Sequence, residues 1–67
     1  MRSIMKKALQ KKYEGQIAEA NANIEIYLKN PAGIGEHSDV LAEVDKQLEL
    51  AASAQEKLVY LVENIGD

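Results

Sequence analysis

The sequence predicts an all-α fold, an antiparallel hairpin of two helices that is expected to assemble into a four-helix bundle. Apolar residues recur every three or four positions on both sides of one interruption, which is the period of amphipathic helices. The interruption is short and contains the only proline and two of the four glycines. The 67 residues therefore form one domain over 1–67, with a helix at about 3–29, a loop at 30–37 and a helix at about 38–65.

The first predicted helix, at about 3–29, contains no proline and only Gly15 as a helix-disfavouring residue. Its apolar stripe consists of Leu9, Tyr13, Ile17, Ala20, Ile24, Tyr27 and Leu28. Gly15 costs about 1 kcal/mol relative to alanine in an exposed helix interior, so it marks either a mild weak point or a close approach of another backbone. The helix is expected to end near Lys29, because Pro31 disfavours helical geometry at Asn30.

The connecting loop carries one branched apolar residue, Ile34, between Gly33 and Gly35. We expect Ile34 to fold over the open end of the helix pair as a plug.

Three potential metal ligands, Glu36, His37 and Asp39, follow the loop glycines within four positions. Metal sites usually draw ligands from more than one element and hold them with further hydrogen bonds, so capping of the next helix is the favoured interpretation. The loop also lacks the glycine spacing and strand context of phosphate-binding motifs. We therefore assign no catalytic, metal or cofactor-binding residue, expect no cofactor, and predict a protein that is not an enzyme.

The second predicted helix is expected to begin near Ser38, whose hydroxyl can cap exposed backbone N–H groups. Asp39 and Glu43 add negative charge near the positive end of the helix dipole. The apolar seam of this helix alternates regularly between steps of three and four and consists of Leu41, Val44, Leu48, Ala51, Gln55, Leu58, Val62 and Ile65.

Gln55 is the only polar member of that seam. A polar residue in an apolar seam can fix register by pairing with its symmetry mate or with a polar group of the first helix, such as Gln10 or Gln16. The alternative is that Gln55 lies at the edge of the seam and reaches water.

Further apolar residues flank the seam on both sides in its C-terminal half. The resulting apolar surface is wider than one hairpin partner can cover. A chain of this size buries only about 60% of its unfolded surface, and without cysteines or a zinc-binding set the remaining route to stability is oligomerisation. We expect a homodimer whose interface contains Leu41, Leu48, Gln55, Leu58, Val59, Leu61 and Val62. As an alternative, the same apolar face can bind a different protein, as an adaptor or inhibitor would.

The first twelve residues contain no acidic side chain and five basic ones, Arg2, Lys6, Lys7, Lys11 and Lys12. Helical geometry spreads these side chains around the helix, and the chain has no Trp or Phe. Solvation or pairing with acids at the end of the second helix is therefore favoured. A nucleic-acid-associated factor that uses the basic N-terminus is a further, less favoured alternative. No membrane partner is expected, and a cytoplasmic location is predicted because no apolar run approaches about 20 residues.

The segment Asn30-Pro31-Ala32-Gly33-Ile34-Gly35-Glu36-His37, followed by Asp39 and the heptads to Leu61, resembles small uncharacterised proteins of contractile-tailed phages of marine cyanobacteria. The resemblance covers the chain from about Met5, and the loop is its specific element. It implies a helical hairpin of phage or marine metagenomic origin and no particular activity. With it, we expect a structural or host-interaction factor in the host cytoplasm or the virion.

Overall fold

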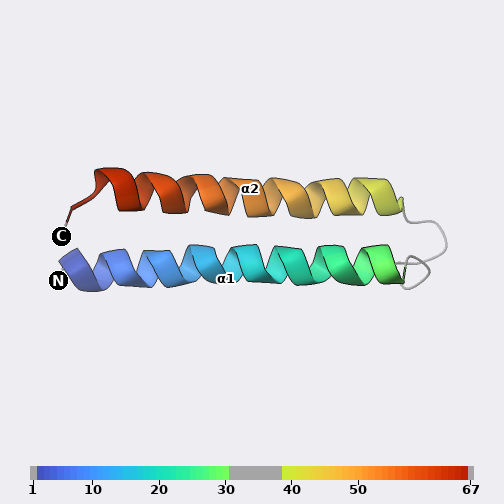
Figure 1. The fold of residues 1–67 in the computed structure, drawn as a ribbon, viewed down its shortest axis with the longest axis horizontal. Helices are drawn as coiled ribbons and strands as arrows, with labels where there is room; N and C mark the ends of the chain where they lie inside the picture. The colour runs from blue at the N-terminus through green and yellow to red at the C-terminus, as the bar shows by residue number, and fades with distance from the viewer. Residues whose placement is uncertain (1, 31–38, 67) are drawn as a thin grey trace.

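A computed structural model describes residues 2–30 and 39–66, which form two helices, α1 (Arg2–Lys29) and α2 (Val40–Asn64). The helices pack side by side and antiparallel, so the two termini lie at the same end of a rod (Figure 1). The rod measures 48 × 15 × 15 Å. The predicted all-α hairpin is confirmed.

Local hydrogen bonds close the C-terminal end of α1 and both ends of α2. At the end of α1, the backbone N–H of Asn30 donates to the carbonyl of Ile26 at 2.9 Å. At the start of α2, Asp39 is the N-cap, and its carboxylate accepts from the backbone N–H of Ala42 at 3.2 Å. The capping role favoured for the acidic residues at this helix start is thus filled by Asp39, whereas Ser38, the other predicted cap, lies outside the described residues.

The core of the hairpin is narrow. Its most buried apolar residues are Ala20 and Ala54, each 2% exposed, and Leu61, 8% exposed. Around them lie half-buried side chains, Tyr13, Ile17, Ile24 and Tyr27 from α1 and Val44, Ala51 and Leu58 from α2. Alanines at the contact let the two helices approach closely, because the distance between helix axes depends on the side chains between them.

One polar pair crosses this core. Gln47 of α2 is buried, and its Oε1 accepts a hydrogen bond from Nδ2 of Asn23 on α1 at 3.2 Å. Leaving a buried amide without a partner costs about 1–3 kcal/mol, so a shift of one helix along the other that broke this bond would be penalised. The pair therefore helps to fix the register of the hairpin.

The row of α2 that faces α1 differs from the predicted seam. Its buried and half-buried members are Val40, Val44, Gln47, Ala51, Ala54, Leu58 and Leu61. The predicted seam shares Val44, Ala51 and Leu58 with this row, whereas its other large members are exposed: Leu41, Leu48, Val62 and Ile65. The prediction followed the largest apolar side chains, but the middle of the contact between the helices is formed by the small residues Ala51 and Ala54 and by the hydrogen-bonded amide of Gln47.

The stripe predicted for α1 is closer to the structure. Leu9 and Leu28 are exposed, and the other five members of the stripe are buried or half-buried. A Cβ added at Gly15 would meet nothing within 4 Å, so no other backbone among the described residues approaches this glycine closely. Within one hairpin, Gly15 is therefore a mild weak point of α1.

Candidate functional site

The candidate site is an exposed apolar surface along α2, which we call the α2 face. It consists of Leu41, Leu48, Ala52, Gln55, Val59 and Val62, which are all exposed. Steps of three, four and seven place these residues on one side of a helix. Leu41 is 81% exposed, Leu48 53% and Val62 51%, so the large side chains of this surface stay in water in a single hairpin.

The α2 face lies beside the contact with α1, not opposite it. Each residue of the buried row Gln47, Ala54 and Leu61 directly precedes a residue of the α2 face. One residue is a rotation of about 100° around an α-helix, since 3.6 residues make a turn. One helix can therefore pack on α1 and on a further helix at the same time, as the helices of a four-helix bundle do.

The residues predicted for the interface divide into three groups. Leu41, Leu48, Gln55, Val59 and Val62 are exposed on the α2 face, Leu58 is half-buried at its border, and Leu61 is buried against α1. The side chain of Leu61 is thus largely covered within one hairpin and offers little surface to a partner. Ala52, which periodicity alone places between Leu48 and Val59, completes the exposed surface.

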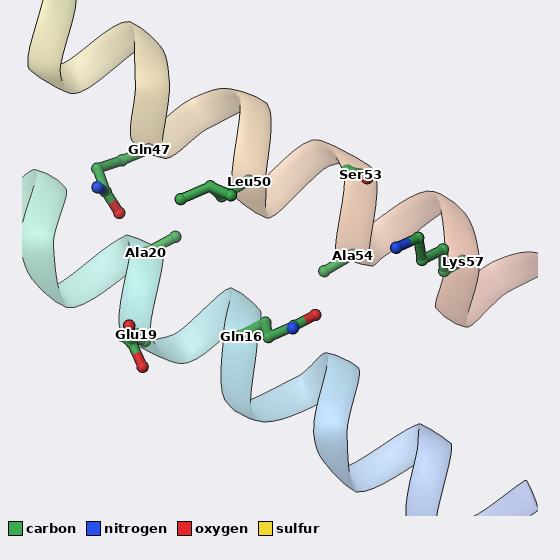
Figure 2. Close-up of a pocket in the computed structure, with 8 residues that line it drawn as sticks. All are labelled: Gln16, Glu19, Ala20, Gln47, Leu50, Ser53, Ala54 and Lys57. Carbon is green, nitrogen blue, oxygen red and sulfur yellow. The ribbon is translucent and has the colours of Figure 1, made fainter.

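A groove of about 220 Å³ runs along the other side of the hairpin (Figure 2). Gln16 reaches from α1 toward α2 along this groove, Lys57 and Leu50 extend from α2, and Glu19 points away from α2 (Figure 2). The Nζ of Lys57 also lies 5.8 Å from the ring centre of Tyr13. The groove mixes polar and charged side chains with apolar ones, whereas the α2 face is mainly aliphatic. The lining of the groove consists of Gln16, Glu19, Ala20, Gln47, Leu50, Ser53, Ala54 and Lys57.

The described residues contain no group of three or more His, Cys, Asp or Glu side chains placed to hold an ion. Asp39, one of the three candidate ligands, caps α2. Glu36 and His37 lie outside the described residues, and so does Ile34, the predicted plug.

Charge is unevenly divided along the rod. In the half that holds the termini, residues 2–15 and 54–66 carry six basic and three acidic side chains, a net charge of +3. In the half next to the loop, residues 16–30 and 39–53 carry two basic and six acidic side chains, a net charge of −4. We call these the basic end and the acidic end of the hairpin.

Ion pairs within α1 leave this division of charge in place. Lys11 pairs with Glu14 and Lys29 with Glu25, each at 3.5 Å and each on the exposed surface. Exposed pairs of this kind contribute only about 0–1 kcal/mol.

Neither helix, over the part of the chain that the structure describes, combines the length and the apolar character needed to cross a membrane. No family model, curated protein or solved structure matches this chain.

Proposed function

We propose that this chain is a non-enzymatic protein that associates with a second copy of itself through the α2 face, forming a homodimeric four-helix bundle. Its main support is the exposure of Leu41, Leu48 and Val62 along one side of a hairpin that has little core. The further role, a small structural or host-interaction factor of phage origin, follows from the resemblance of the loop to phage hairpin proteins.

The area of the exposed surface supports a partner of about the size of a second copy. The chain exposes 5206 Å², whereas a compact folded monomer of 7.4 kDa exposes about 4,200 Å². The excess of about 1,000 Å² is comparable to the roughly 800 Å² that each partner buries in a standard protein interface. The radius of gyration, 15.1 Å, likewise exceeds the value of about 11 Å for a compact domain of this length.

The hairpin is a single layer of helices, and stable domains bury the apolar side of one layer against another. Full burial of a leucine contributes about 1.5–3 kcal/mol relative to full exposure. Covering Leu41, which is 81% exposed, regains most of this energy, and covering Leu48 regains about half of it. A second hairpin on the α2 face therefore supplies stabilisation that Ala20, Ala54 and Leu61 alone do not.

The alternative is an adaptor or inhibitor that presents the same face to a different protein. Such a protein is monomeric in isolation, while a homodimer is stabilised by its own concentration. The distribution of charge favours the second copy, because the basic and acidic ends of one hairpin complement those of another.

Thermal unfolding at different chain concentrations tests the proposal. For a dimer of two 67-residue chains, raising the concentration about a hundredfold should raise the melting temperature by about 10 °C, because unfolding is coupled to dissociation. Circular dichroism at the helical minimum provides the measurement. A melting temperature that stays constant over this range would favour the monomeric adaptor.

A further inference from the structure

We infer that the two α2 helices pack antiparallel in the dimer, so that the basic end of one hairpin lies beside the acidic end of the other. This arrangement rests on the proposed self-association and specifies its geometry. The two copies are related by a two-fold axis that crosses α2 at right angles near Ala52.

The α2 face is suited to a symmetric contact about its middle. The small residue Ala52 lies close to the centre, with Leu41 and Leu48 toward one end and Val59 and Val62 toward the other. In an antiparallel pair about this axis, Leu41 of one copy comes near Val62 of the other, and Leu48 lies between Gln55 and Val59 of the other. Two Ala52 residues at the axis allow the helices to approach closely.

The apolar residues permit a parallel pair as well, since each would then meet its own equivalent. Charge separates the two orientations. A parallel pair places the two ends of net charge +3 side by side and the two ends of net charge −4 side by side. An antiparallel pair places +3 beside −4 at both ends of the bundle.

The energies involved are sufficient to choose between two otherwise similar packings. Charges on neighbouring helices lie within the Debye length of about 8–10 Å at physiological salt, so they act on each other across the bundle. Each exposed pair contributes only about 0–1 kcal/mol, but all of the net charge at both ends favours the same orientation. The helix dipoles also attract in the antiparallel pair and repel in the parallel one.

Distances between spin labels on the two copies of the full chain test this geometry. The chain has no cysteine, so the single variants Ala42→Cys and Glu56→Cys each carry one label per copy. Both positions are exposed and lie outside the α2 face as defined above.

For an axis near Ala52, a rise of 1.5 Å per residue separates the two labels at position 42 by about 30 Å along the helices, and those at position 56 by about 12 Å. In a parallel pair, neither position has a separation along the helices, so both distances are short and similar. The expected result is therefore a clearly longer distance at position 42 than at position 56.

Short and similar distances at both positions, from a protein that sediments as a dimer, would overturn the antiparallel arrangement while leaving self-association intact. Absence of any distance between copies, together with sedimentation as a monomer, would overturn the proposed self-association and the arrangement with it.

Discussion

Replacing Leu48 with aspartate is expected to dissociate the homodimer, raising the dissociation constant by roughly a hundredfold or more. Leu48 lies near the middle of the α2 face, and 53% of it is exposed in a single hairpin. In the dimer the new carboxylate would be buried beside Val59 and Gln55 of the other copy, without a cation. An unpaired buried charge costs several kcal/mol, and each 1.4 kcal/mol is about a tenfold change in affinity.

Leu50→Asp is the matched control. Leu50 is 54% exposed, almost the same as Leu48, and the two residues lie on the same helix. Leu50 follows Leu48 by two residues, which is a rotation of about 200° around the helix axis. It therefore lies on the side of the groove that Gln16 lines. This variant should keep the affinity of the unsubstituted chain.

Sedimentation velocity of both variants, with circular dichroism to verify their helix content, provides the comparison. If Leu48→Asp and Leu50→Asp weaken association equally, or if neither does, the α2 face is not the dimer interface.

Replacing Leu61 with alanine should cause the largest loss of stability within the hairpin. Leu61 is 8% exposed and is the largest of the three buried apolar side chains among the described residues. Leucine-to-alanine changes at buried sites cost about 2–5 kcal/mol, because they remove apolar contacts and leave a cavity. A core of this size rarely supplies more than about 3–5 kcal/mol, so the variant should melt about 15 °C lower or be unfolded at room temperature.

Leu50→Ala makes the same chemical change at a residue that is 54% exposed, and it should lower the melting temperature by only a few degrees, about 4–8 °C per kcal/mol lost. Thermal melts of both variants at one high concentration keep association from dominating the comparison. An equal loss for the two variants would show that the core does not lie where the structure places it.

Positions of the helices were predictable from the sequence because one proline and two glycines interrupt otherwise regular periodicity. The sequence placed the helices at about 3–29 and 38–65, and the structure has them at Arg2–Lys29 and Val40–Asn64. Tyr13, Ile17 and Ala20 were also assigned to the inner side of α1, since that helix has one apolar row clearly larger than its neighbours.

The inner row of α2 was not predictable in the same way. This helix has two apolar rows one residue apart, one with Leu41 and Leu48 and the other with Ala54 and Leu61. Periodicity ranks such rows by the size of their side chains, whereas close packing of two helices favours small ones. Gln47 is polar, and the sequence does not indicate that Asn23 on the other helix donates a hydrogen bond to it. The row that contains Gln47 is therefore recognised as the inner row only from the structure.

The same ambiguity explains the outcome for the predicted interface. Five of its seven residues lie on the exposed α2 face: Leu41, Leu48, Gln55 and Val62 belong to the predicted seam but are exposed in the hairpin, and Val59 flanks that seam. Leu61 was grouped with them because a helix that is apolar over more than one stripe does not indicate which stripe its hairpin partner covers.

Sedimentation equilibrium of the unsubstituted chain tests self-association most directly, since it measures mass independently of shape. A chain of 7.4 kDa that pairs through the α2 face should sediment with twice that mass at high concentration and dissociate on dilution. A single species of 7.4 kDa at every concentration, with the helices intact, would contradict the account.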